Sequence, residues 1–70
     1  MIRLKVKEIA QAQGFSQAKL ARKADLDNGT VRDIFHNPYR DINLSTLDKI
    51  AQALSVNASE LIESISGPEK

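Results

Sequence analysis

Apolar side chains recur along this chain at the spacing of helix faces, most clearly between residues 17 and 36. This pattern predicts one helix over 17–24 and a second over 28–36, because apolar residues three and four positions apart line one face of a helix. The apolar faces consist of Leu20, Ala21 and Ala24 in the first helix, and of Val31, Ile34 and Phe35 in the second. The other positions are mostly polar, so we expect both helices to be buried on one side only.

The residues around the turn between these helices support the assignment. Ser16 and Asp27 stand at positions where N-cap side chains are favoured, and Asp25 and Leu26 form the turn. Ala21 is small enough to let the two helices cross closely. Two short helices joined by a turn of this length form the helix-turn-helix unit, whose second helix enters the major groove of DNA. Similar helix pairs also occur in small helical domains that bind no DNA.

The segment before the helix pair begins with an alternating pattern. Ile2 and Leu4 alternate with Arg3 and Lys5, which is the period of a strand. Such a segment either pairs with a strand of this chain or of a second copy, or forms a frayed terminus. A first helix is expected to begin near residues 5–7 and to end at Gly14, because glycine readily adopts the left-handed conformation of many helix ends.

The segment after the helix pair carries two further helix signals. Asn37-Pro38 ends the second helix of the pair, and the apolar positions between residues 44 and 54 predict a fourth helix capped by Asn43 or Ser45. The capping box that starts at Asn57 predicts a fifth helix. Beyond it Leu61, Ile62 and Ile65 form an apolar edge, which either covers the core or forms a dimer surface. We expect one domain over residues 1–66 and a loose tail over 67–70.

Composition excludes several classes of protein. The chain of 70 residues has no cysteine and one histidine, so we expect no disulfide, no metal site and no cofactor. It has no apolar run of membrane-spanning length and no secretory signal pattern, so we expect a soluble, cytoplasmic protein without membrane contact. Catalytic motifs are absent as well, and we expect no enzyme activity and no small-molecule ligand.

Charge is distributed unevenly along the chain. Residues 1–40 contain eight Lys and Arg and four Asp and Glu, a net charge of +4, whereas residues 41–70 contain two and five, a net charge of −3. The helix pair lies in the basic part, which suits contact with phosphates. Chance asymmetry in a short chain is the alternative explanation.

Two stretches resemble the lambda Cro/C1 repressor-like, or XRE, family of helix-turn-helix proteins. They are FSQAKLARKADLDNGTVRDIF over 15–35 and LSTLDKIAQALSVNASELI over 44–62. The resemblance implies an all-α, compact five-helix DNA-binding domain that acts as a homodimer on a pseudo-palindromic operator. The short extended N-terminal segment is expected from the alternating pattern alone. Asp25 occupies a turn position where the family usually has glycine. Because Asp tolerates the left-handed conformation better than most other residues, we expect the turn to be kept at some cost in stability. Gly29 occupies a position where the family more often has a base-reading side chain.

The residues expected to contact DNA follow from the helix-turn-helix reading. Arg32 can donate two hydrogen bonds to guanine and Asn28 can pair with adenine, although Arg32 is also suited to a phosphate or to an ion pair with a neighbouring acid. Asp33 either accepts from cytosine or orients an arginine, and we favour orientation. The expected base-reading residues are Asn28, Gly29, Arg32 and Asp33. The expected phosphate contacts are Gln17, Lys19, Arg22, Thr30, His36, Tyr39 and Arg40.

Two functions are compatible with these observations. The first is a sequence-specific transcriptional regulator, specifically a repressor, with double-stranded DNA and a second copy of the chain as partners. The alternative is an antitoxin-like or adaptor module that binds a protein partner through its C-terminal apolar edge and binds DNA weakly.

Overall fold

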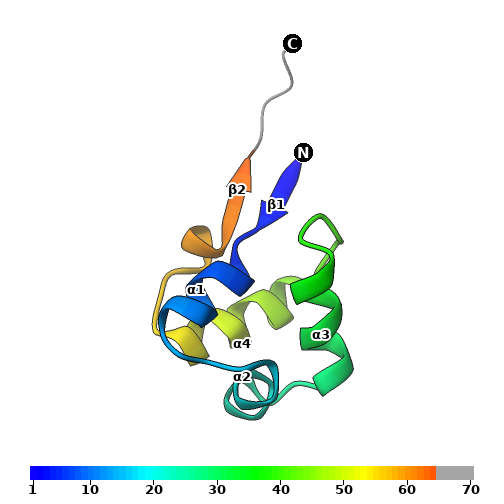
Figure 1. Ribbon diagram of the computed structural model, residues 1–70. Coiled ribbons are helices and arrows are strands. Elements are labelled where there is room, and N and C mark those ends of the chain that lie inside the picture. Colours follow the sequence, from blue (N-terminus) through cyan, green and yellow to red (C-terminus); the bar gives the residue numbers. More distant parts are fainter. Residues whose placement is uncertain (65–70) are drawn as a thin grey trace.

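The structure is a computed structural model in which residues 1–64 are described. Four α-helices form the body, and two short strands lie side by side and project from it (Figure 1). The elements in chain order are β1 (Ile2–Leu4), α1 (Val6–Ala12), α2 (Gln17–Ala24), α3 (Asn28–His36), α4 (Leu44–Leu54), the 3-10 helix η1 (Ala58–Leu61) and β2 (Ile62–Ser64). Among these residues no helix is long and apolar enough to cross a membrane.

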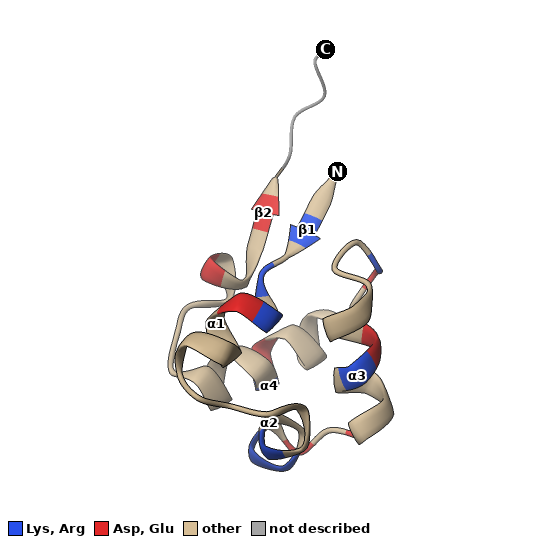
Figure 2. Cartoon of the chain, in the orientation of Figure 1, with Lys and Arg blue, Asp and Glu red and all other residues tan. Residues whose placement is uncertain are grey.

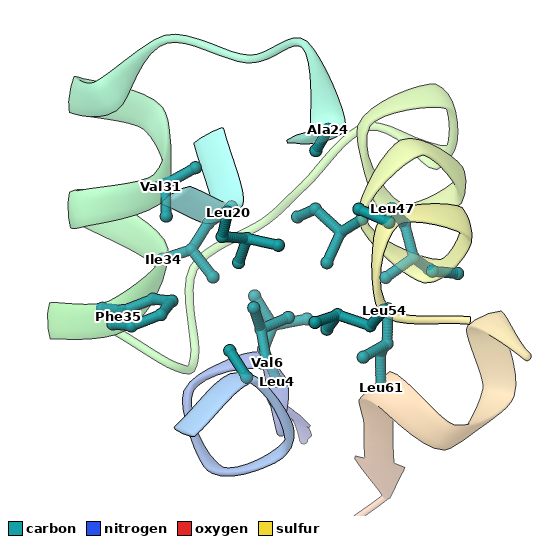
Figure 3. Close-up of a cluster of buried hydrophobic side chains, with 14 of the residues drawn as sticks. Leu4, Val6, Leu20, Ala24, Val31, Ile34, Phe35, Leu47, Leu54 and Leu61 are labelled. Atoms are coloured by element: carbon teal, nitrogen blue, oxygen red, sulfur yellow. The ribbon is translucent and has the colours of Figure 1, made fainter. Parts of the chain in front are cut away.

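A single apolar core holds the helix pair in place. Figure 3 shows side chains from every helix and from both ends of the described chain converging on it. Leu20 of α2 is completely buried, and Ala21 beside it is nearly so. Val31 and Ile34 anchor the inner face of α3, so the predicted apolar faces of both helices are the buried ones.

Three of the helices end in the same way. One or two residues beyond the last residue of each helix, the backbone takes a positive φ. The value is 80° at Gly14 after α1, 58° at Asp25 after α2 and 57° at Ser55 after α4. The N–H of the next residue then reaches the carbonyl five positions back, which is the hydrogen bond of the Schellman motif. These bonds run from Phe15 to Ala10 (2.8 Å), from Leu26 to Ala21 (2.8 Å) and from Val56 to Ala51 (3.0 Å). The expectation that Asp25 keeps a left-handed turn is therefore confirmed.

The predicted caps are confirmed to different degrees. The Ser16 hydroxyl accepts from the N–H of Lys19 (3.1 Å), as a side-chain N-cap does. Asp27 stands at the N-cap of α3 but makes no such bond with its side chain. Asn43, rather than Ser45, occupies the N-cap of α4. The turn between α2 and α3 thus depends on backbone bonds rather than on the Asp27 side chain, whereas Ser16 caps the other end of α2.

The prediction of a fifth α-helix is wrong, and the mostly helical domain also contains a short two-stranded sheet. After Asn57 the chain makes one 3-10 turn, in which the Glu60 carboxylate accepts from the Asn57 N–H (3.2 Å), and then becomes β2. β2 pairs antiparallel with β1, and Leu4 lies opposite Ile62. The alternating start of the chain therefore forms a strand whose partner belongs to the same chain. If residues 62–64 continued the helix, the backbone N–H and C=O groups of β1 would lose the strand they pair with.

The residues of the apolar edge predicted near the end of the chain differ in their exposure to solvent. Leu61 is 0% exposed and belongs to the core, whereas Ile62 is 36% exposed. Ile65 and the predicted tail over 67–70 lie outside the described residues. The core alternative is thus confirmed for Leu61, which leaves Ile62 as the exposed member among the residues described.

Arg3 links three elements at the strand end of the molecule. Its guanidinium pairs with Glu8 of α1 and with Glu63 of β2, the latter at 3.4 Å. The hydrogen bond with Glu8 raises the pKa of Arg3 above its ordinary value. Burial alone would raise the pKa of the Glu8 carboxyl, but the hydrogen bond from Arg3 and the nearby positive charges outweigh it and lower that pKa.

Candidate nucleic-acid interface

The outward face of α3 brings the four predicted base-reading residues together. Asn28, Arg32 and Asp33 are exposed, and Gly29 between them is half-buried. At 3.6 residues per turn these four positions and His36 fall within about 140° of the helix circumference. The opposite side of α3 is buried in the core. The helix therefore presents a compact polar surface on a rigid support.

Gly29 is not required by the fold. Its φ is not positive, and a Cβ built at this position meets no atom within 4 Å. A helix with glycine at such a place loses stability relative to alanine, by about 1 kcal/mol in a helix interior. The open space above Gly29 faces away from the protein, so any advantage of glycine here has to come from something that binds this face.

Asp33 forms an ion pair with Arg40. Arg40 Nη1 lies 3.1 Å from Asp33 Oδ2, and Arg40 Nε donates to the Asp41 carbonyl (3.3 Å). The loop that carries Arg40 is organised by Asn37, whose side chain accepts from the Tyr39 N–H (3.3 Å) and whose carbonyl accepts from the Arg40 N–H (3.2 Å). The interpretation that Asp33 orients an arginine agrees with this geometry, and the arginine concerned is Arg40.

Arg32 and His36 are linked through the helix backbone. His36 Nδ1 lies 2.8 Å from the Arg32 carbonyl, and because a carbonyl only accepts, Nδ1 carries the proton in this bond. The Arg32 guanidinium forms no ion pair with any residue in the described range. Its positive charge is therefore left for a ligand, as a base or phosphate contact requires.

Basic side chains also lie along α2. The ammonium groups of Lys19 and Lys23 lie 5.2 and 5.4 Å from the centre of the Phe15 ring, within the range of cation–π attraction. Gln17 begins the helix, where N–H groups and the helix dipole favour an anion. Figure 2 shows basic residues gathered on α2, whereas at the strand end basic residues of β1 and α1 stand beside acidic residues of α1 and β2. The charge asymmetry along the sequence is therefore not a complete separation of charge in space.

The geometry of this face and the match to a known family agree. The sequence model of the Cro/C1-type helix-turn-helix DNA-binding domain matches residues 5–66. The chain belongs to this family. It is a helix-turn-helix DNA-binding domain of Cro/C1 type, and double-stranded DNA is the partner of such a domain.

Two solved structures are similar to this Cro/C1-type domain. The restriction-modification controller protein C.AhdI from Aeromonas hydrophila is 30% identical and superposes with a TM-score of 0.73 over 80% of this chain and 83% of that chain. A putative DNA-binding protein from Bacteroides fragilis is 22% identical, with a TM-score of 0.78 over 90% of this chain and all of that chain. The second likeness supports the fold alone. No curated protein matches the chain.

The remaining predicted contacts of this Cro/C1-type domain lie around the helix pair. Arg22 is exposed on α2, and Tyr39 is 49% exposed in the loop after α3. Thr30 is half-buried and lines a hollow of about 290 Å³ together with Thr46 and the loop that carries Arg40. Thr30 thus sits at the flank of α3 rather than on the face that carries Asn28.

The cluster around Phe15 was not predicted from the sequence. Phe15, Lys19 and Lys23 are four positions apart, and this spacing places them along one side of α2 and the turn before it. The two ammonium groups consequently meet on one ring. Aromatic and basic residues at four-residue intervals are the signal that would have identified the cluster.

Proposed function

We propose that the protein is a sequence-specific transcriptional regulator, and specifically a repressor, that binds DNA as a homodimer. The observation that carries the proposal is the outward face of α3, where polar side chains lie together over a buried apolar side. Two copies related by a twofold axis would place their α3 helices in successive major grooves, about 34 to 36 Å apart. Repression then needs only that the bound dimer occupies a promoter.

The residues of the helix pair divide into two roles. Arg32 and Asn28 read bases, because guanidinium and amide groups form paired hydrogen bonds with guanine and adenine. Arg40, oriented by Asp33, and the start of α2 hold the DNA backbone. This division is supported by the Arg32 guanidinium, which forms no ion pair within residues 1–64, and by the Asp33–Arg40 pair. The controller protein that resembles this chain is a further, independent support for regulation.

Selection of bound duplexes from a random DNA pool at physiological salt tests the proposal. We expect enrichment of a pseudo-palindrome whose half-sites are one helical turn apart. Failure of the folded protein to enrich any sequence would contradict sequence-specific binding and would favour the adaptor alternative.

Variants at two arginines separate base reading from backbone contact. Arg32→Ala is expected to cost about 1 to 3 kcal/mol on the selected site and to relax preference at one position. Arg22→Ala removes the same charge from α2 and is expected to weaken all duplexes alike. If Arg32→Ala also weakens all duplexes alike, Arg32 contacts the DNA backbone, and the proposal that it reads a base has to be revised.

A further inference from the structure

A groove runs along the border between α1 and the helix pair. It encloses about 500 Å³ between α1, the start of α2 and the end of α3. Lys7 and Gln11 line it from α1, Ser16 and Gln17 from α2, and His36 from α3. A second hollow of about 390 Å³ continues it toward β1 and again includes Lys7, Gln11 and His36. None of these residues of α1 belongs to the helix-turn-helix unit.

The walls of the groove offer hydrogen-bond donors and positive charge. Lys7 and Gln11 are four positions apart, so both side chains lie on the side of α1 that faces the groove. No Asp or Glu is among the described residues that line the first hollow. Glu8 lines the second hollow, but its carboxylate is already paired with Arg3. The groove therefore suits an anion.

Phe15 provides an independent observation on the same groove. Its ring forms part of the wall, and it holds the ammonium groups of Lys19 and Lys23 near by. On the opposite wall His36 donates its Nδ1–H to the Arg32 carbonyl, so Nε2 of the neutral ring is an acceptor and offers no hydrogen bond to an anion. Donor groups from α1 and from the start of α2 thus line one opening, and the Lys7 ammonium is the cation among them.

We propose that this groove binds a backbone phosphate of DNA, with Lys7 of α1 as its principal ligand. The inference rests on the proposed function, because Gln17 and His36 belong both to the groove and to the border of the DNA-facing surface. A DNA strand that passes the start of α2 meets Lys7 next. The backbone contact of this domain then extends beyond the helix pair onto α1.

Binding of a DNA duplex by Lys7→Gln over a series of salt concentrations tests the assignment. The binding constant scales with salt concentration to a power of about −0.9 for each phosphate contact. Loss of one contact is therefore expected to reduce the slope by about 0.9 and the affinity at 0.1 M salt about eightfold. The order of preference among duplexes should not change, because a phosphate carries no sequence information.

Two matched variants make the result specific. Lys49→Gln removes the same charge from an exposed position on α4 that lines a separate hollow, and it should leave slope and affinity nearly unchanged. Lys7→Arg keeps the charge and should retain the slope. If Lys7→Gln and Lys49→Gln behave alike while the unmodified protein binds DNA, the Lys7 assignment is wrong and the proposed function stands. If the unmodified protein binds no duplex, the proposed function fails and the assignment fails with it.

Discussion

The two ends of this small domain differ in whether their arginine side chains form ion pairs. At the strand end, Arg3 is held between the carboxylates of Glu8 and Glu63. On the helix-pair face, Arg22 and Arg32 form no ion pair with any residue of the described chain, and Arg40 has one partner. Charges that neutralise each other contribute to the fold, whereas unpaired charges are available to a polyanion. The comparison separates a structural end from the helix-pair face, which is the proposed binding face.

The largest effect is expected at the structural end, from Leu61→Ala. Removal of a fully buried leucine side chain costs about 2 to 5 kcal/mol, which is a large part of the stability of a domain of this size. Urea unfolding measures the loss, and Ile62→Ala, at the exposed neighbouring position, is the matched control with a much smaller effect. Equal stability of the two variants would show that Leu61 is not part of the core.

A smaller effect of opposite sign is expected on the binding face, from Gly29→Ala. The helix should gain up to about 1 kcal/mol, because alanine fits the open space and restricts the unfolded chain. DNA affinity should fall if glycine serves close approach to DNA. Thermal unfolding and duplex binding measure the two quantities. The control Gly14→Ala should lose stability, because φ at Gly14 is +80°.

The smallest effect is expected from Glu8→Gln, which removes the ion pair with Arg3 and is measured by acid unfolding. The pKa of Glu8 is lower in the folded protein than in the unfolded chain, where it is about 4.3. The pair therefore stabilises the fold above that value, and its contribution is lost as the pH falls through the lower, folded pKa. Glu8→Gln should shift the midpoint of acid unfolding by a fraction of a pH unit toward neutral pH.

A double variant with both Arg3→Gln and Glu8→Gln tests whether the shift in acid unfolding comes from the ion pair between these two side chains. Because each substitution alone already breaks the same contact, the double variant should lose less than the sum of the two single losses. Fully additive losses would mean that the two side chains act separately.

Local signals predicted the helix pair well. The apolar spacing of α2 and α3, the Ser16 cap and the left-handed turn at Asp25 each depend on residues close in sequence. The Asp33–Arg40 pair depends on the course of a loop, which the sequence does not specify at that detail. The roles of Asn28 and Arg32 toward bases stay predictions, because they concern a partner that is not part of the chain.

The end of the chain shows where local signals fail. A capping box at Asn57 marks where a helix starts but not how far it continues. Ile62 leaves the helical path because β1, some sixty positions earlier, offers a strand to pair with. An apolar spacing likewise cannot tell whether Leu61 faces a core or a second subunit. Both outcomes are set by contacts between residues that are distant in sequence.

The pairing of β1 with β2 also bears on how the domain folds. Its register joins Ile2 to Ser64, so almost the whole described chain forms the loop that this pairing closes (Figure 1). Closing a long loop costs more conformational entropy than forming a helix, whose contacts are local. The strands are therefore expected to form after the helices and to open before them. The amide hydrogens of the sheet should exchange with solvent while those of α2 and α3 are still protected. The helix pair is therefore expected to stay folded when the two strands have already separated.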